Sequence, residues 1–322
     1  MNKTNYIYPL KLSHVAKETV WGGSYLNKKY GKLPTGTIGE TWELSVREHE
    51  RNTIQNGPCA SMTLNEYLEK HSAISSTSFP LLIKFIDACD DLSVQVHPND
   101  ENASDFGLSN GKTEIWYVLK AEPGASIVYG TLPGTTKEVL RKSLRNGSVK
   151  DLLNYVQVSP GEAYFIPGGM MHMIGRGIVV AEIQQNSDTT FRVYDHGRVD
   201  KNGKPRELHV ESAISAFTSF STEDIQKLAF SHTVKNDMGG KVLTSNRFFT
   251  VISKSINGGE TFAETPNGFL SLLCTDGCGI ISWNNSEEKI SAGDSFFIPS
   301  ELSEFKLEGN MDLLLSFQTQ EK

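Results

Sequence analysis

A mainly β fold with inserted α-helices is the architecture that the sequence predicts, and two observations lead to it. Most of the 322 residues fall into short apolar segments separated by turn residues, which is typical of all-β proteins. One segment also recurs, because Gly161–Pro167 (GEAYFIP) and Gly293–Pro299 (GDSFFIP) share four of seven residues. A repeated turn and strand indicates two related units, and chance similarity between two strands is the alternative explanation.

Each predicted strand is a run of apolar, β-branched or aromatic residues bounded by glycine, proline or polar residues. In the strand at 93–97 (SVQVH), the period of two places Gln95 and His97 on one face. In chain order the predicted strands are 38–46, 80–87, 93–97, 113–119, 126–130, 162–167, 179–184, 247–256, 268–274 and 295–299.

Helices are predicted where a capping pattern or a helical period replaces this alternation. Thr63 and Glu66 form a capping-box pattern, in which each side chain accepts from a free backbone N–H of the first turn. Residues 209–217 place apolar side chains at i, i+4 and i+7, on one helix face. The predicted helical segments are 63–71, 135–145, 151–156 and 209–217, and Gly147 ends the second of them.

A boundary between two domains is predicted in residues 235–246 (KNDMGGKVLTSN), where polar residues and two glycines interrupt the apolar pattern. We therefore expect a catalytic domain of residues 1–234 with helical insertions. The second domain is expected to cover residues 235–322.

Composition and charge exclude several classes of protein. Hydrophobic residues make up 38% of the chain and charged residues 21%, which is typical of a folded protein. The net charge of −7, with no basic block, argues against nucleic acid as the partner but allows a small anionic substrate. The first residues show no apolar signal segment, no stretch is long enough to span a membrane, and the four cysteines form no disulfide framework. These features predict a cytoplasmic enzyme or binding protein without a membrane partner.

Four side chains with metal-binding chemistry surround the first copy of the repeat. Gln95 and His97 share a strand face, and Glu114 lies in the next strand, where antiparallel pairing would bring it alongside His97. His172 follows the repeated strand. Two imidazoles, a carboxylate and an amide oxygen suit a divalent cation, for which Zn²⁺ is the best match and Fe²⁺ or Mn²⁺ are alternatives. The alternative without a metal is a set of separate polar residues at strand ends.

The spacing around His172 resembles the second motif of the cupin superfamily. The motif positions are occupied by Gly161, Pro167, Gly169 and His172. This resemblance implies cupin-type, jelly-roll β-barrels, two in this chain because the motif strand is repeated. In the second copy Glu304 takes the place of His172, and no histidine follows His232. We therefore expect the second barrel to hold no metal.

Further segments of the chain share the pattern of one family. They are Trp21-Gly22, Glu40–Ser45 (ETWELS), Pro80–Lys84 (PLLIK), Leu92–Pro98 (LSVQVHP), Lys112–Glu114 (KTE), Glu182 and Asn186–Arg192 (NSDTTFR). Together they resemble the type I mannose-6-phosphate isomerases, in particular the short bacterial form. Two departures are that Met173 and Ile174 stand where longer members have an aromatic residue, and that His172 and Glu182 are one residue further apart than expected.

The resemblance implies a ligand set, a cavity and a reaction. One Zn²⁺ per chain would be bound by Gln95, His97, Glu114 and His172. The catalytic cavity would be lined by Arg192, Lys112, Glu182 and Asp188. The reaction would interconvert mannose 6-phosphate and fructose 6-phosphate through a cis-enediol, so that the partner is a small sugar phosphate.

Individual roles stay open at this point. Arg192 would hold an enediolate oxygen or the phosphate, and either Lys112 or Glu182 would move the proton. In the simpler alternative, Lys112 and Glu182 pair only with each other, and Asp188 is a turn former that orients Arg192. The basic loop residues are expected to be solvated and receive no phosphate role; they are Arg198, Lys204 and Arg206.

Other functions are compatible with a cupin fold, which hosts many activities. An Fe²⁺ dioxygenase would use similar ligands but would leave Lys112, Asp188 and Arg192 without a role. A non-catalytic, sugar-phosphate-binding bicupin is a second alternative. An isomerase paralogue for another sugar phosphate is the third.

Overall fold

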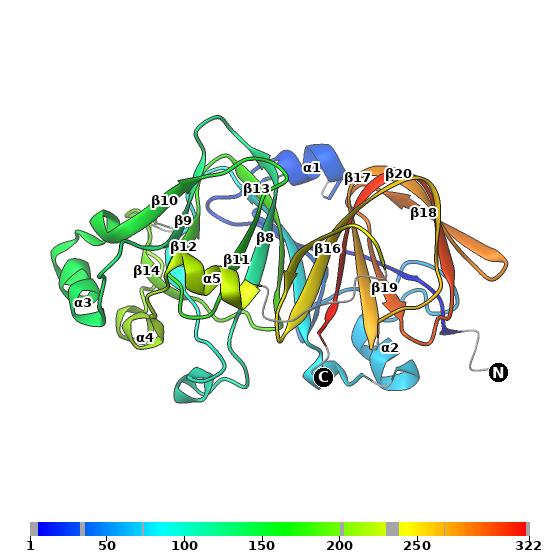
Figure 1. The fold of residues 1–322 in the computed structure, drawn as a ribbon, viewed down its shortest axis with the longest axis horizontal. Coiled ribbons are helices and arrows are strands. Elements are labelled where there is room, and N and C mark those ends of the chain that lie inside the picture. The colour runs from blue at the N-terminus through cyan, green and yellow to red at the C-terminus, as the bar shows by residue number, and fades with distance from the viewer. Residues whose placement is uncertain are drawn as a thin grey trace.

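The computed structural model describes residues 6–32, 36–72, 74–199, 203–229, 238–266 and 268–319. Figure 1 shows two β-rich halves beside each other, with most of the helices on their outer sides. The prediction of a mainly β fold with inserted helices is confirmed. Within these ranges, each helix is too short or too polar to cross a lipid bilayer. The predicted boundary between residues 234 and 235 lies outside the described residues.

Two sheets make up the first half, and apolar side chains such as Val96, Val128 and Val180 fill the space between them. The five-stranded sheet has the order β10-β9-β12-β7-β14, and the six-stranded sheet has the order β11-β8-β13-β6-β3-β2. Their strands are β2 (Val15–Lys17), β3 (Glu40–Leu44), β6 (Leu81–Ala88), β7 (Val94–Val96), β8 (Glu114–Ala121), β9 (Ser126–Thr131), β10 (Leu153–Gln157), β11 (Ala163–Ile166), β12 (His172–Ile174), β13 (Ile178–Gln185) and β14 (Phe191–Tyr194). A separate hairpin joins β4 (Val46–Arg47) to β5 (Glu50–Arg51).

The second half is one seven-stranded sheet of order β1-β19-β17-β20-β16-β15, with β18 beside β17. Its strands are β1 (Leu10–Leu12), β15 (Lys241–Ser245), β16 (Phe249–Phe262), β17 (Phe269–Trp283), β18 (Ser286–Ser291), β19 (Ser295–Pro299) and β20 (Phe305–Gln318). β1 comes from the start of the chain, drawn in blue in Figure 1, and pairs antiparallel with β19. Among the described residues each large sheet keeps edge strands, so hydrogen bonding alone closes neither half into a barrel.

The two copies of the sequence repeat have the same local structure. Gly161 and Gly293 have left-handed φ angles of 87° and 91°, and each leads into a strand, β11 and β19 respectively. At Gly293 space also excludes a side chain, because an added Cβ would lie 2.7 Å from Cβ of Tyr30. The repeat therefore marks two equivalent turns, one in each half.

The six-stranded sheet is buried on both faces, and the alternation along its strands separates two kinds of environment. Odd-numbered residues such as Ile83, Phe85 and Ile183 join an apolar cluster with Leu273 and Phe297 of the seven-stranded sheet. Even-numbered residues of the same strands face the five-stranded sheet. The second half thus supports, from behind, the sheet whose other face lines the space inside the first half.

Helices connect the strands at the periphery. The capping box of Thr63 and Glu66 opens α2, as predicted. α3 begins one residue later than predicted, since its N-cap is Thr136, whose hydroxyl accepts from Val139 N. The helices are α1 (Tyr25–Tyr30), α2 (Leu64–His71), α3 (Lys137–Asn146), α4 (Val210–Ala216) and α5 (Thr222–Ala229), with 3-10 turns η2 (Ser76–Ser78), η3 (Ala103–Phe106) and η4 (Val149–Leu152). The sequence patterns did not predict α1 or α5.

The helical prediction for residues 151–156 is wrong. The 3-10 turn η4 ends at Leu152, and β10 continues from Leu153 in antiparallel pairing with β9. Local propensity is weak over so short a segment, and the free edge of β9 offers backbone partners that a single helical turn lacks.

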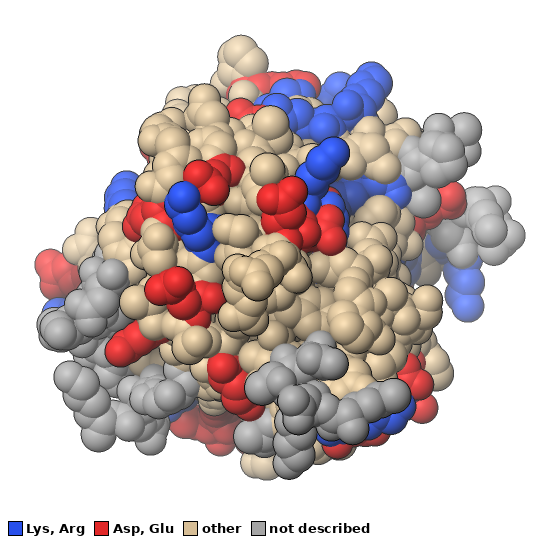
Figure 2. All heavy atoms as spheres, turned by 90° about the vertical axis from the view of Figure 1, so that its right-hand side faces the viewer, with Lys and Arg blue, Asp and Glu red and all other residues tan. Residues whose placement is uncertain are grey.

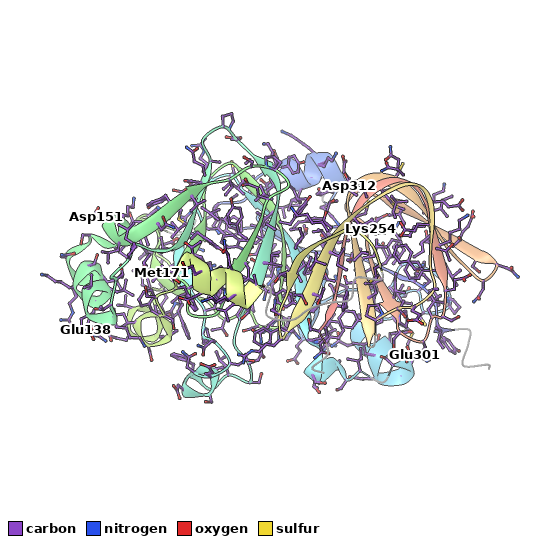
Figure 3. The ribbon with its side chains drawn as sticks, in the orientation of Figure 1. Glu138, Asp151, Met171, Lys254, Glu301 and Asp312 are labelled. Atoms are coloured by element: carbon purple, nitrogen blue, oxygen red, sulfur yellow. The ribbon has the colours of Figure 1, made fainter. Side chains whose placement is uncertain are left out.

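The outer surface of the second half carries mixed charges. Figure 2 shows acidic and basic side chains interspersed over the face that this half presents. Figure 3 labels Lys254 and Asp312 in this half, and Met171 in the half that holds the five- and six-stranded sheets. Met171 directly precedes His172, which begins β12 of this half.

Candidate metal centre

Three fully buried side chains meet between the two sheets of the first half. His97 follows β7, Glu114 begins β8 and His172 begins β12, and their ligand atoms all lie within 4.8 Å of one another. Each histidine Nε2 is 3.5 Å from one oxygen of Glu114, and the two Nε2 atoms are 3.1 Å apart. Three residues far apart in the sequence thus direct their ligand atoms at one point.

The strands that supply these residues are not paired as predicted. Gln95 lies opposite His172 in the antiparallel pair β7–β12, but β8 pairs with β11 and β13 of the other sheet. The expected strand pairing of His97 with Glu114 is therefore wrong, although the two side chains do meet. The chain between them passes from one sheet to the other, so that Glu114 reaches the histidines across the space between the sheets.

The chemistry of this group fits a divalent cation. Both carboxylate oxygens of Glu114 are buried without a hydrogen-bond partner. His172 Nδ1 lies 2.8 Å from the carbonyl oxygen of Met170, an arrangement that holds the ring proton on Nδ1 and leaves the Nε2 lone pair facing Glu114. Lys112 Nζ lies 3.2 Å from Oε2 without forming a hydrogen bond, and no described donor reaches Oε1. A cation bound between these oxygens and the imidazoles would compensate for the burial of the carboxylate.

The surroundings also set the protonation that metal binding needs. Burial, aided by the charge of Lys112, lowers the pKa of His97 to about 3, and burial lowers the pKa of His172 as well. Burial alone would raise the pKa of Glu114, but the charge of Lys112 holds this pKa well below its usual value. Neutral imidazoles beside an ionised carboxylate are the forms that bind divalent metals.

Gln95, the fourth predicted ligand, borders the same point. Its amide nitrogen is 3.3 Å from His172 Nε2, and its amide oxygen is 3.4 Å from the hydroxyl of Ser93. A half-turn of the amide exchanges these two atoms, after which the oxygen faces the histidines and the nitrogen donates to Ser93. Gln95 is therefore within reach of a cation held by the three buried residues.

A row of four side chains crosses the six-stranded sheet on the same face. Trp116 on β8, Glu182 on β13, Lys84 on β6 and Trp42 on β3 occupy directly opposed positions. Trp116 Nε1 donates to Glu182 Oε2 over 2.8 Å. Lys84 Nζ lies 3.6 Å from Glu182 Oε1 and 3.4 Å from Glu40 Oε2. The row places a carboxylate and an ammonium group side by side between two indoles.

The electrostatics of this row differ for its two charged members. Burial would lower the pKa of Lys84, but Glu40 and Glu182 raise it above its ordinary value, so Lys84 is charged. Burial and the neighbouring charge of Glu114 raise the pKa of Glu182. Glu182 Oε1 is also buried without a hydrogen-bond partner. A carboxylate in this state is a stronger base than a solvated one.

Lys112 and Asp188 take partners that the sequence did not predict. Lys112 Nζ is 3.2 Å from Glu114 Oε2, whereas Glu182 faces Lys84 and Trp116, so the exclusive pairing of Lys112 with Glu182 is wrong. Asp188 is exposed and lies 4.0 Å from Lys84 Nζ. An ion pair thus connects Asp188 to the row, whereas the ion pair of Lys112 connects it to Glu114 of the buried histidine group.

Arg192 lies near two loop arginines, Arg198 and Arg206, which bind Asp195, and the three form a cationic group. Arg192 donates from Nε to Ser93 Oγ over 3.2 Å and from Nη1 to the carbonyl of Glu207 over 3.0 Å. Arg198 donates to Asp195 Oδ1 and Arg206 to Asp195 Oδ2, each over 2.7 Å. The expectation that both loop arginines are solvated is wrong, because Asp195 holds them against the body of the protein. Lys204 is exposed, as expected.

These groups line one cavity of about 100 Å³. Its lining residues are Trp21, Glu40, Lys84, Ile86, Leu92, Ser93, Gln95, Lys112, Trp116, Ile174, Glu182, Asp188, Thr190, Arg192 and Arg206. The cavity is therefore polar, rich in both charges and bounded on one side by Gln95 of the metal-ligand group.

Comparisons with known proteins agree with this geometry. The model of the phosphomannose isomerase type I catalytic domain matches residues 9–125, and that of the mannose-6-phosphate isomerase cupin domain matches residues 240–318. The chain is 35% identical to mannose-6-phosphate isomerase ManA of Bacillus subtilis over 96% of its length and 98% of that protein. The chain belongs to the type I phosphomannose isomerase family.

Further relatives of this phosphomannose isomerase family extend the likeness. A mannose-6-phosphate isomerase of Streptococcus mutans is 35% identical, over 96% of this chain and 98% of that protein. The crystal structure of the mannose 6-phosphate isomerase from Bacillus subtilis superposes with a TM-score of 0.86 at 32% identity, covering 96% of this chain and 99% of that one. Both halves of the chain are therefore covered.

Some residues of this family member's cavity were not singled out from the sequence. Lys84, Glu40, Trp42 and Trp116 lie within predicted strands, and only the structure shows that they share one face. A signal was present for Lys84, because an ammonium group in the middle of the apolar run PLLIKFID needs a buried partner.

Proposed function

We propose that this chain is a metal-dependent aldose–ketose isomerase that interconverts mannose 6-phosphate and fructose 6-phosphate. The carrying observation is the buried group of His97, Glu114 and His172 beside a cavity that contains a buried carboxylate, Glu182, with one free oxygen. The names of its full-length relatives support the same activity and substrate.

The proposed metal is one Zn²⁺ per chain, held by Gln95, His97, Glu114 and His172. Two imidazole nitrogens and carboxylate and amide oxygens are a donor set that zinc accepts while keeping positions open for substrate. When bound there, the ion would supply stabilisation for negative charge developing on the substrate oxygens.

The proposed proton acceptor is Glu182. Its Oε1 takes the proton from C2 of the open-chain aldose, the C2–H electron pair forms the C1–C2 double bond, and the carbonyl pair moves to O1, which gains a proton. In the second half of the reaction the same proton is delivered from Glu182 to C1, and C2 becomes the ketone carbon. O2 loses a proton that replaces the one gained by O1, so no net proton is taken up or released. Glu182 begins and ends in the same protonation state, as a catalyst must.

Charge balance suggests where the phosphate lies. Lys84, Lys112 and a divalent ion balance four acidic side chains: Glu40, Glu182 and Asp188 of the cavity and Glu114 of the buried histidine group. Arg198 and Arg206 share the carboxylate of Asp195, and Arg198 also lies 3.6 Å from Asp90 Oδ2. Arg192 donates to a hydroxyl and to a backbone carbonyl, and burial together with Arg206 lowers its pKa. A dianionic phosphate at this cationic group would relieve the repulsion between the arginines, so we assign it to Arg192 and Arg206.

The alternatives from the sequence are weaker for stated reasons. A dioxygenase would not need the buried ion pairs of Lys84 and Lys112, and a purely binding protein would not need the free oxygen of Glu182. An isomerase for another sugar phosphate uses the same groups, and only substrate comparison separates it from the proposed function.

The domain arrangement belongs to the proposal as well. We take residues 1–234 and 235–322 as two cupin-type, jelly-roll units, the second without a metal. The cupin model that matches residues 240–318 and the equivalent turns at Gly161 and Gly293 support this division. β1 would then cross from the first unit to complete the sheet of the second. A cytoplasmic location stays a prediction from the sequence.

A coupled assay tests the activity. Purified protein of measured metal content converts mannose 6-phosphate to fructose 6-phosphate, which is followed through a dehydrogenase couple. We expect turnover that disappears with a chelator and returns with Zn²⁺. If zinc-replete protein converts another aldose phosphate but not mannose 6-phosphate, the substrate assignment is wrong.

A further inference from the structure

Trp116 connects the proposed proton acceptor to the metal-ligand group. Its indole N–H donates to Glu182 Oε2 over 2.8 Å, and its ring meets the His172 ring edge-on with centroids 5.5 Å apart. Trp116 is 1% exposed, so water does not compete for either contact. One side chain thus touches both parts of the candidate site.

The hydrogen bond divides the carboxylate of Glu182 into a held oxygen and a free one. Oε2 accepts from the indole, whereas Oε1 is buried and has no hydrogen-bond partner. Lys84 Nζ is 3.6 Å from Oε1, which is beyond hydrogen-bond range. Rotation of the carboxylate would break its bond to Trp116, so that bond fixes the direction of Oε1.

The sheet fixes the contact from behind. Trp116 and Glu182 are directly opposed in the β8–β13 ladder, where side chains on one face approach closely. Their neighbours Ile115 and Ile183 point to the other face and are locked in the apolar cluster with the seven-stranded sheet. The seven-stranded sheet therefore stabilises the position of both side chains.

We propose that Trp116 is a positioning residue for proton transfer, which holds Glu182 so that Oε1 faces C1 and C2 of the bound sugar. This role rests on the proposed isomerase function and on Glu182 as the proton acceptor. A neutral donor suits the task, because it orients the carboxylate without adding another full charge beside Lys84. Lysine or arginine at this position would bind the carboxylate more tightly and make it a weaker base.

The test uses the full-length zinc protein and the variant Trp116→Phe, which keeps an aromatic edge near His172 but has no donor. We expect kcat to fall by about 10-fold to 100-fold, within the range that a misplaced general base costs. KM for mannose 6-phosphate and the zinc content should stay close to the wild-type values. The primary isotope effect with 2-deuterated mannose 6-phosphate should increase, because C2–H cleavage becomes more rate-limiting.

Two comparisons separate positioning from general damage. Trp283→Phe makes the same chemical change on β17 of the other half and should leave kcat and the isotope effect unchanged. In a Glu182→Gln background, Trp116→Phe should cause no further loss of kcat, because its effect passes through the carboxylate. An equal further loss in that background would overturn the role.

The remaining outcomes are also decisive. An active wild-type protein whose Trp116→Phe variant keeps its kcat would refute the positioning role alone, whereas wild-type protein inactive on mannose 6-phosphate would refute the isomerase and this role together. If Trp116→Phe loses its zinc, the hydrogen bond between Trp116 and Glu182 is tested instead by NMR of protein that keeps Trp116 and is labelled with ¹⁵N-tryptophan. One of the four indole signals should then shift in Glu182→Gln, and four unshifted signals would overturn the contact.

Discussion

Removal of the metal should lower the thermal stability of the protein by a predictable amount. His97, Glu114 and His172 are each at most 1% exposed, so an ion between them is bound only by the folded chain. Zinc at a thousandfold excess over its Kd then adds about 4 kcal/mol to the free energy of unfolding. The entropy of unfolding is about 2.1 cal/mol/K per residue, or about 0.7 kcal/mol/K for the whole chain. Loss of about 4 kcal/mol on chelation should therefore lower Tm by about 6 °C.

Differential scanning calorimetry measures this shift on chelated protein with and without added Zn²⁺. His97→Ala should lose most of the zinc-dependent rise in Tm, because it removes a ligand and leaves the others without their geometry. His49→Ala is the matched control, since His49 is exposed in the turn between β4 and β5 and should leave the rise intact. If His97→Ala shows the full rise in Tm, zinc does not bind at this group.

Two further predictions concern the cavity. Arg192→Ala should keep its zinc and lose about 10-fold to 100-fold in kcat/KM for mannose 6-phosphate, because one charge-assisted contact to the substrate is removed; unchanged steady-state kinetics would take Arg192 out of the mechanism. Burial and Glu114 raise the pKa of Glu182, and only its unprotonated form accepts a proton, so kcat should fall as the pH drops through a pKa above the usual glutamate value. A pH–rate profile should show this acid limb in the wild-type protein, and the residual activity of Glu182→Gln should lack it.

Local sequence patterns were sufficient for much of the fold around the site. The alternation in SVQVH placed Gln95 and His97 on one face, and the turn at Gly161 led into the predicted strand β11. These features depend on a few neighbouring residues, whose conformations are restricted by side-chain periodicity and by the left-handed glycine. The ligand candidates could therefore be identified before their arrangement was known.

The arrangement of the sheets could not be read in the same way. Residues 98–113, which include the turn η3, connect His97 to Glu114, and pairing of consecutive strands is the common outcome. Here the loop carries the chain to the opposite sheet, and β8 finds its partners in β11 and β13. Which strands pair depends on contacts between residues far apart in the sequence, and these leave no local pattern.

The burial of charged residues offers a signal that reaches further than strand pairing. β6 and β13 are buried along their whole length. The seven-stranded sheet covers one face of these strands, and the five-stranded sheet covers the other. In such strands a charge is tolerated only with a partner, so Lys84 and Glu182 at opposed positions explain each other. A pair that served stability alone would gain little over two packed apolar side chains. Lys84 and Glu182 are therefore better explained by chemistry on a bound substrate than by folding, because Oε1 of this glutamate has no hydrogen-bond donor.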